Sequence, residues 1–352
     1  MHLFQYKNGE LHAEGVPLRD IIAQVGTPTY IYSHATLVRH LKAYEDAFRG
    51  VPHVTCFALK ANSNAAVVKL LAKHGGGADI VSGGELFRAL RAGVPPRKIV
   101  YAGVGKTEEE IRYALKSKIL MLNVESEDEL REIDRIAGEM KVKAPIAFRI
   151  NPDIDPLTHP YISTGLKKYK FGIPIEKAVS YYKLAQKLRN IRIVGIHKHI
   201  GSQLTKISPF VDALKKILPL IDELAGHGIR ISHLDMGGGL GITYKDETPP
   251  LPSDLAGKIM PLLKGRQLTL VFEPGRSIVG NAGILVTRVL YLKNGDKKKF
   301  VIVDAGMNDL MRPSLYDAYH YIQPVVKNRR GPIVADIVGP VCESGDFLAK
   351  GR

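Results

Sequence analysis

The chain has 352 residues, 45% of them hydrophobic and 24% charged, so it is long enough to bury a large core and to form two domains. Fifty lysine and arginine residues against 35 aspartate and glutamate residues give a net charge of +15, which attracts anions. Because the basic residues are dispersed and no aromatic-basic RNA-binding motif accompanies them, a solvated basic surface is favoured over a nucleic-acid site.

The cysteine content and the amino-terminal sequence indicate the cellular compartment of the protein. The two cysteines, Cys56 and Cys342, are too few for a disulfide framework and lack metal-ligand spacing, so we expect a reducing compartment and no bound metal. Residues 1–10 lack the basic-then-apolar layout of a signal peptide, and no apolar run is long enough to span a membrane. The sequence therefore predicts a soluble, cytoplasmic protein that does not bind a membrane.

The first part of the chain predicts short elements that do not yet form a regular series. Short extended segments flank the turn Lys7–Glu10, and an apolar-periodic stretch follows near Leu18–Val25. Thr29–Tyr32 predicts a strand, and Ser33 is a suitable N-cap for a helix that continues to Phe48.

From residue 54 onward, short β-branched runs alternate with amphipathic stretches. The expected strands are Val54–Leu59, Asp79–Val81, Ile99–Tyr101, Ile119–Val124, Ile146–Ile150, Ile193–Ile200, His233–Met236 and Leu268–Phe272. Eight βα units over roughly 250 residues predict a closed (β/α)8 barrel whose chemistry collects at the carboxyl ends of the strands. The residues at those ends include Lys60, Ser82, Asn123, Arg149, His199, Gly237–Gly239 and Glu273.

Two departures from this rhythm complete the expected fold. The polar connection Asn151–Gly172 is long enough to be an active-site lid, or else an insertion without a role. Beyond Glu273, strand-like runs without long helices predict a second, β-sandwich or β-barrel domain. These runs are Ile284–Leu290, Lys299–Val303, Ile322–Val326 and Ile333–Val338. We expect the barrel to span residues 27–274 and the β domain to combine residues 1–26 and 275–352.

Lys60 is the first candidate for covalent chemistry. A lysine at a strand end can attack a carbonyl and form a Schiff base if its surroundings lower its pKa. The ordinary alternative is a solvated lysine. Glu273, at the end of the last barrel strand, could hold a pyridine nitrogen protonated, as carbanion-forming decarboxylation requires, or could form a simple surface pair with Arg276.

Three further motifs have both a chemical and a structural interpretation. The glycines of Gly237–Gly241 could admit a phosphate or merely allow tight packing. His197 and His199 should share one face of a strand. They could bind a metal as a pair, but no third ligand is evident. We prefer His199 as a flat ring against an aromatic cofactor, and the structural alternative is a hydrogen-bonded core histidine. Cys342 could donate a proton to a carbanion, or it could be a small buried residue at a turn of the β domain.

The segment Phe57–Asn62 resembles the cofactor-lysine motif of the fold-type III pyridoxal-phosphate decarboxylases. Other segments are similar to motifs of the diaminopimelate decarboxylase family, in the family's order and over nearly the whole chain. They are Ala78–Leu86, His199–Gln203, Gly237–Gly241, Glu273–Arg276, Met311–Tyr316 and Cys342–Asp346. A glutamate at position 273 separates the chain from the alanine racemases of the same fold type, which place an arginine there.

The resemblance implies that pyridoxal 5'-phosphate is bound to Lys60 as a Schiff base, with the His199 ring stacked on it and Glu273 paired with its pyridine nitrogen. The remaining cofactor contacts that it implies come from Asp79, Ser202, Gly238, Gly239, Pro274, Gly275 and Arg276, the glycines holding the phosphate.

For the substrate, the resemblance implies that Arg276, Arg312 and Tyr316 grip carboxylates. Cys342 as proton donor and Glu343 as reader of the distal ammonium group would come from the partner subunit of a homodimer. The family continues past its Cys-Glu-Ser-Gly-Asp segment, whereas this sequence stops at Arg352. If the protein truly ended there, we would expect poor stability and weak activity.

The function expected from these residues is decarboxylation of meso-2,6-diaminopimelate to L-lysine, the last step of lysine biosynthesis. One alternative is a decarboxylase of another basic amino acid, such as ornithine, arginine or carboxynorspermidine, and Arg312 argues against substrates that lack a second carboxylate. Another is a non-catalytic relative that binds the cofactor. A third is a basic nucleic-acid-binding protein, which would show steeply salt-dependent retention of DNA or RNA.

Overall fold

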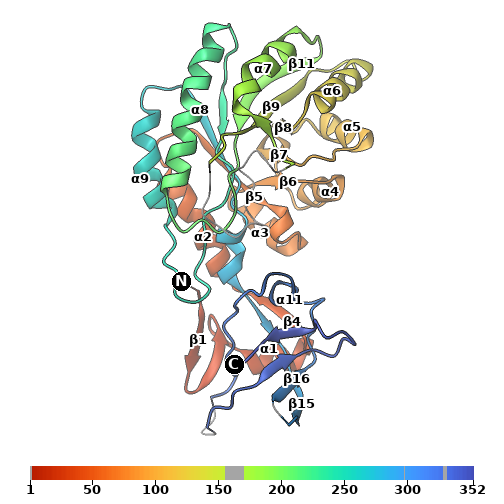
Figure 1. Ribbon diagram of the computed structural model, residues 1–352, viewed down its shortest axis with the longest axis vertical. Coiled ribbons are helices and arrows are strands. Elements are labelled where there is room, and N and C mark those ends of the chain that lie inside the picture. Colours follow the sequence, from red (N-terminus) through yellow and green to blue (C-terminus); the bar gives the residue numbers. More distant parts are fainter. Residues whose placement is uncertain (1, 155–169, 297, 328–330) are drawn as a thin grey trace. The chain divides into compact units, whose positions relative to one another are not determined.

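The computed structural model describes residues 2–154, 170–296, 298–327 and 331–352. The chain forms two compact units (Figure 1). Unit 1 consists of Met1–Leu37, Thr243–Glu247 and Asn281–Arg352, and unit 2 consists of Val38–Ile242 and Thr248–Gly280. Among the described residues, no helix combines the length and the apolar character needed to cross a membrane.

Unit 2 is a closed barrel of eight parallel strands, which confirms the predicted architecture. The strands are β5 (His53–Ala58), β6 (Gly77–Ile80), β7 (Ile99–Tyr101), β8 (Met121–Val124), β9 (Ala144–Asn151), β11 (Ile191–His197), β12 (His233–Asp235) and β13 (Thr269–Phe272). The ring closes where β13 pairs with β5, with Val271 opposite Val54. Lys60 and Glu273, which follow these two strands, therefore lie at the same end of the barrel.

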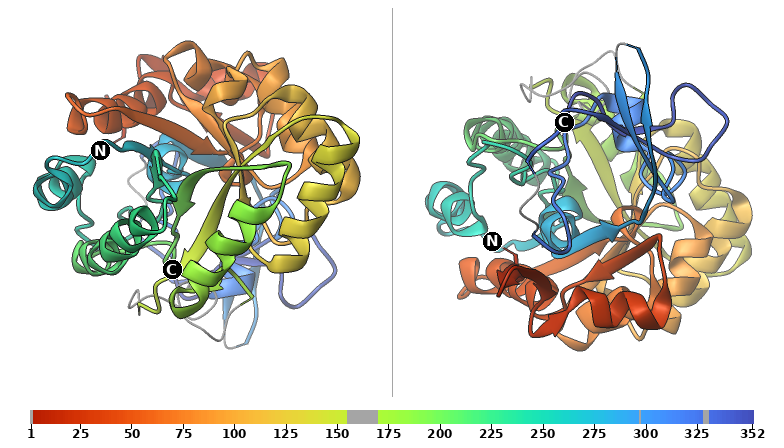
Figure 2. Two further views of the ribbon diagram at one scale, coloured as in Figure 1. Left: turned by 90° about the horizontal axis from the view of Figure 1, so that it is seen from above. Right: turned by 90° about the horizontal axis from the view of Figure 1, so that it is seen from below.

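The strands are buried on both faces because helices surround them, as the views in Figure 2 show. The helices are α2 (His34–Ala47), α3 (Ala65–Lys73), α4 (Gly83–Arg91), α5 (Glu108–Ser117), α6 (Glu127–Glu139), α7 (Ala178–Lys187), α8 (Ser208–Gly226), α9 (Pro252–Leu263) and α10 (Arg276–Val279). Inside the ring, Cys56, Val100, Met121, Ala147 and Val271 form part of one apolar cluster. The thiol of Cys56 is thus a core group.

The expected lid at Asn151–Gly172 falls largely on residues 155–169, which lie outside the described residues. On its carboxyl side, β10 (Ile173–Pro174) pairs parallel with the end of β9. One carboxylate fixes this region: Glu125 accepts hydrogen bonds from Arg149 Nη1 at 3.1 Å and from the backbone N–H of Gly172 at 2.8 Å.

The described residues of unit 1 form small sheets and short helices, which confirms a separate β-sheet domain. The sheets are formed by β1 (Phe4–Lys7), β2 (Glu10–Ala13) and β3 (Val16–Pro17), by β4 (Thr29–Tyr32) with β14 (Gly283–Val286), and by β15 (Val289–Asn294), β16 (Lys299–Val303), β17 (Asp336–Val338) and β18 (Phe347–Ala349). The helices are α1 (Leu18–Val25) and α11 (Arg312–Tyr316).

Two of the expected strands in unit 1 are wrong in detail. The run Ile284–Leu290 is divided between β14 and β15, because Asp304 Oδ1 accepts hydrogen bonds from Thr287 Oγ1 at 2.6 Å and from the backbone N–H of Arg288 at 2.8 Å. The run Ile322–Val326 makes only an isolated bridge, between Val326 and Glu10. Pro324 interrupts it, since proline has no N–H to donate to a ladder.

Candidate active site

Lys60 follows β5 in a short 3-10 turn, and its Nζ donates a hydrogen bond to Oδ2 of Asp79, on β6. The Asp79 side chain is fully buried, whereas the Lys60 side chain keeps 49% of its surface exposed. Burial alone would lower the pKa of Lys60, but the charges of Asp79 and Glu273 outweigh it and raise that pKa. The condition for attack on a carbonyl, a lowered pKa of Lys60, is therefore not met by these residues alone.

Asp79 has an altered proton affinity of its own. Its burial and the negative charge of Glu273 raise the pKa of Asp79 to about 7, although the ammonium group of Lys60 opposes this. The other oxygen of the carboxyl, Oδ1, has no hydrogen-bond partner among the described residues. Oδ1 of Asp79 can therefore accept a hydrogen bond from a bound ligand.

Glu273 directly follows β13 and is buried among groups that favour its ionised form. Nε2 of His197 lies 3.2 Å from its Oε2, and Nδ2 of Asn123 donates to its Oε1 at 3.4 Å. Burial would raise the pKa of Glu273, but the interactions with His197 and the charge of Lys60 lower it. The carboxylate is thus negatively charged and held in orientation, as a partner for a protonated ring nitrogen must be.

His199, just beyond β11, has the uncharged and flat ring that stacking requires. Burial, together with the positive charge of Arg149, holds the pKa of His199 well below its ordinary value. Nδ1 accepts a hydrogen bond from the backbone N–H of Gly238 at 3.2 Å, so the proton of the neutral ring is on Nε2. This contact ties the ring to the glycine-rich turn.

The glycines of this turn have no room for a side chain. A Cβ at Gly238 would lie 2.2 Å from the carbonyl oxygen of Glu273, and one at Gly239, where φ is +118°, would lie 2.4 Å from that of Gly201. A Cβ at Gly275 would lie 3.1 Å from the Cβ of Ala61, the residue after Lys60. These close backbone approaches suit the binding of an anion by peptide N–H groups.

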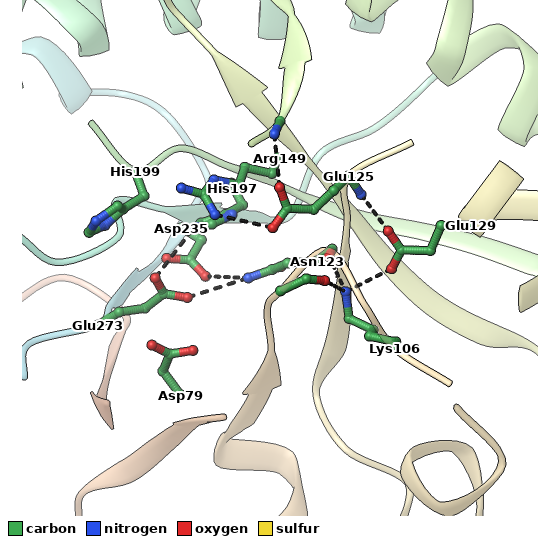
Figure 3. A network of polar contacts seen from close by, with 12 residues as sticks. Asp79, Lys106, Asn123, Glu125, Glu129, Arg149, His197, His199, Asp235 and Glu273 are labelled. Carbon is green, nitrogen blue, oxygen red and sulfur yellow. Dashed lines mark hydrogen bonds and ion pairs between the residues drawn. The ribbon is translucent and has the colours of Figure 1, made fainter. Parts of the chain in front are cut away.

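Sequence reasoning missed Asp235 and the pairing of His197 with Glu273 (Figure 3). Asp235 ends β12, accepts a hydrogen bond from the backbone N–H of Gly237 at 2.9 Å and lies 3.3 Å from Nδ2 of Asn123. Burial and the nearby charge of Glu273 raise its pKa well above the ordinary value. The signal was available, because Asp235 stands at a strand end immediately before the glycines.

The same three groups bear on the metal question. Ligand atoms of His197, Asp235 and Glu273 lie within 4.8 Å of one another, so the groups that could bind a metal together with His197 are two carboxylates and not His199. Yet Glu273 is already hydrogen-bonded by His197 and Asn123. We interpret His197, Asp235 and Glu273 as part of a buried hydrogen-bonded network beneath the site and not as a metal site.

The other predicted site residues lie on several elements. In unit 2, the carbonyl oxygen of Pro274 accepts the N–H of Ala58 at 3.1 Å, Arg276 begins α10, and Ser202 follows His199 in the chain. In unit 1, Arg312 and Tyr316 are the first and last residues of α11.

Cys342 and Glu343 lie in a turn of unit 1 that precedes β18. Cys342 is exposed. Oxygens of the buried Asp346 carboxylate accept hydrogen bonds from the backbone N–H groups of Met307 at 2.6 Å and Val341 at 2.7 Å. Asp346 therefore determines the conformation in which Cys342 and Glu343 are presented.

The groups of unit 2 fit an aromatic aldehyde that carries a phosphate: an amine, an ionised carboxylate, a neutral imidazole and a glycine turn. Two buried atoms, Asp79 Oδ1 and His197 Nδ1, have no hydrogen-bond partner in the part of the chain that the structure describes. A barrel with such a site is typical of enzymes that use pyridoxal phosphate. Consistently, residues 34–280 match the pyridoxal binding domain of the pyridoxal-dependent decarboxylases, and the chain belongs to that family.

Its relatives define the branch of the family. The chain is 54% identical to the diaminopimelate decarboxylase of Pseudomonas aeruginosa over 352 residues, covering 100% of this chain and 85% of the relative. It is also 54% identical to that of Aquifex aeolicus over 349 residues, covering 99% and 83%. The chain is thus a member of the diaminopimelate decarboxylase family.

Solved structures agree. Diaminopimelate decarboxylase from M. jannaschii, in co-complex with L-lysine, superposes with a TM-score of 0.94 at 41% identity, covering 99% of this chain and 83% of that one. The Helicobacter pylori enzyme, complexed with L-lysine, gives 0.92 at 45% identity, covering 95% and 84%. The predicted family and fold are therefore confirmed.

Proposed function

We propose that the chain is a carboxy-lyase that removes CO2 from meso-2,6-diaminopimelate and releases L-lysine, with pyridoxal 5'-phosphate as cofactor. The observation that carries the proposal is the position of Lys60 and Glu273 at one end of the barrel, just after the two strands where the ring closes, in a chain 54% identical to diaminopimelate decarboxylases. When bound, the cofactor supplies an electron sink for the electron pair left behind as CO2 departs.

The residues of unit 2 have the following proposed roles. Lys60 would hold the aldehyde carbon covalently, and Glu273 would keep a proton on the ring nitrogen, supported by its hydrogen bonds from His197 and Asn123. His199 would cover one face of the ring. Gly238, Gly239, Gly275 and Ser202 would hold the phosphate, with Asp79, Pro274 and Arg276 completing the cofactor contacts.

The residues that we propose for the substrate lie mainly in unit 1. Arg276, Arg312 and Tyr316 would bind its carboxylates, because a guanidinium can hold a carboxylate by two hydrogen bonds. Glu343 would bind the distal ammonium group, and Cys342 would return a proton to the carbon that has lost CO2. We also propose a homodimer in which Cys342 and Glu343 come from the second copy.

Visible spectroscopy followed by CO2 measurement tests the proposal. The purified protein, supplied with pyridoxal phosphate, is expected to show a visible absorbance band that Lys60→Ala lacks. It should release CO2 from meso-diaminopimelate far faster than from L-ornithine, L-lysine or L-arginine. A band without CO2 release would make the protein a binder, and faster release from one of the other amino acids would change the substrate.

A further inference from the structure

Arg312 is held by two aromatic side chains of unit 1. Its guanidinium carbon lies 4.4 Å from the ring centre of Tyr244, and its Nη1 lies 2.9 Å from Nε2 of His320. The rings of Tyr244 and His320 meet edge to face, with 5.6 Å between their centres and 84° between their planes. We name Tyr244 and His320 the arginine cradle.

The chemistry of the cradle fixes the protonation of His320. A guanidinium only donates hydrogen bonds, so Nε2 of His320 must be the acceptor and carries no proton. The face of Tyr244 attracts the cation through its ring quadrupole. The contact with the ring of Tyr244 and the hydrogen bond to His320 together restrict the orientation of the guanidinium more than either contact would alone.

The position of Tyr244 is fixed by a hydrogen-bonded turn, residues 243–247. The carboxylate oxygen Oε2 of Glu247 accepts hydrogen bonds from the backbone N–H groups of Tyr244 at 2.8 Å and Lys245 at 2.7 Å. Thr243 Oγ1 donates to the carbonyl oxygen of Glu247 at 2.8 Å, and Asn281 Nδ2 donates to that of Thr243 at 3.2 Å. Four hydrogen bonds thus hold the turn that presents the ring.

We propose that Tyr244 and His320 are positioning residues that orient Arg312 toward the substrate carboxylate that is kept in the product. The inference rests on the proposed role of Arg312 in binding that carboxylate. An arginine held in one plane can form two parallel hydrogen bonds with a carboxylate, so its orientation contributes to affinity. The cradle therefore favours amino acids with a distal carboxylate over diamines of the same length.

Two probes isolate this effect. L-lysine carries the retained carboxylate, and cadaverine is the same molecule with that carboxylate replaced by hydrogen. The dissociation constants of both are measured on the cofactor-loaded protein by calorimetric titration. Tyr244→Leu should weaken L-lysine binding by about threefold to thirtyfold and leave cadaverine binding unchanged. Tyr244→Phe keeps the ring face and should bind L-lysine as the unaltered protein does.

His320 is tested in the same way. His320→Ala should weaken L-lysine binding by about tenfold, because an acceptor for a charged donor is lost. His320→Gln can still accept a hydrogen bond and should recover part of the loss. Unchanged cadaverine binding in each variant shows that the protein is folded and loaded with cofactor.

Arg312→Met separates failure of the inference from failure of the proposed function. If Arg312→Met weakens L-lysine binding selectively while Tyr244→Leu and His320→Ala do not, the cradle has no positioning role and the inference is overturned. If Arg312→Met leaves the preference for L-lysine over cadaverine unaltered, the proposed role of Arg312 is itself wrong. Equal weakening of both probes in the cradle variants would also overturn the inference.

Discussion

Nε2 of His197, the last residue of β11, lies 3.2 Å from Oε2 of Glu273, which follows β13, although these two strands are not neighbours in the barrel. The contact spans the ring across the end of β12. Because both side chains are buried, it fixes the direction of the carboxylate more firmly than a surface pair would.

Replacing Glu273 by Gln removes the charge and keeps the shape. If Glu273 keeps the ring nitrogen protonated, Glu273→Gln should lower kcat by about 10²–10³-fold, because a charge that stabilises the transition state is lost. Steady-state kinetics on meso-diaminopimelate measure this, and exposed Glu109→Gln is the control. A variant with unaltered kcat would contradict the role.

Replacing His197 removes the partner of Glu273. His197→Ala should lower the free energy of unfolding by about 1–3 kcal/mol, because the buried carboxylate loses a hydrogen bond. It should also lower kcat by a smaller factor than Glu273→Gln. Urea denaturation and kinetics give both values, with His227→Ala, at the exposed end of α8, as the control. A His197→Ala variant as stable as the unaltered protein would show that the contact contributes little.

Lys60 tests covalent attachment of the cofactor. Lys60→Ala should lose the visible absorbance band and nearly all CO2 release, because the proposed covalent bond to the cofactor is formed by the Lys60 amine. Exposed Lys69→Ala, on α3, should keep both. Persistence of the band in Lys60→Ala would assign the cofactor to another lysine.

Asp79 predicts a particular pH dependence of the cofactor-free protein. Its pKa is about 7 when folded against an ordinary value of 3.8, so between these values the folded state holds a proton that the unfolded chain has released. The free energy of unfolding should therefore fall as pH rises from about 4 to 7. Asp79→Asn, which cannot titrate, should lack this contribution.

The measurement for Asp79 is urea denaturation at several pH values in that window. The stability advantage of the unaltered protein over Asp79→Asn should shrink as pH rises, whereas exposed Asp212→Asn should follow the unaltered protein throughout. A constant difference between the unaltered protein and Asp79→Asn would mean that Asp79 does not titrate there.

Cys342 is the proposed proton donor. Cys342→Ala should lower kcat by about 10²–10⁴-fold with little change in KM, as expected for the loss of a general acid. Neighbouring Ser344→Ala should have little effect. A parallel loss in both variants would indicate damage to the turn instead of loss of the thiol.

Most of the barrel could be predicted because each strand is a short apolar run between amphipathic stretches, as at Ile99–Tyr101. Lys60, His199 and Glu273 could be proposed because strand ends collect chemistry in such barrels. The pairing of His197 with Glu273 could not be predicted, because it depends on the curvature of the barrel. The apolar periodicity of the sequence carries no information about that curvature. The split at Thr287 and Arg288 was missed for a related reason: it comes from a side chain distant in sequence, Asp304.

The seam between β13 and β5 has a consequence for biosynthesis of the protein. As the chain is translated, β5 is synthesised early and β13 is the last of the barrel strands. A partial chain that ends before Thr269 therefore contains Lys60 but neither Glu273 nor Gly275. Stable binding of the aldehyde cofactor would therefore require the complete barrel. The visible absorbance of the bound cofactor would then report closure of the barrel in a nascent or refolding chain.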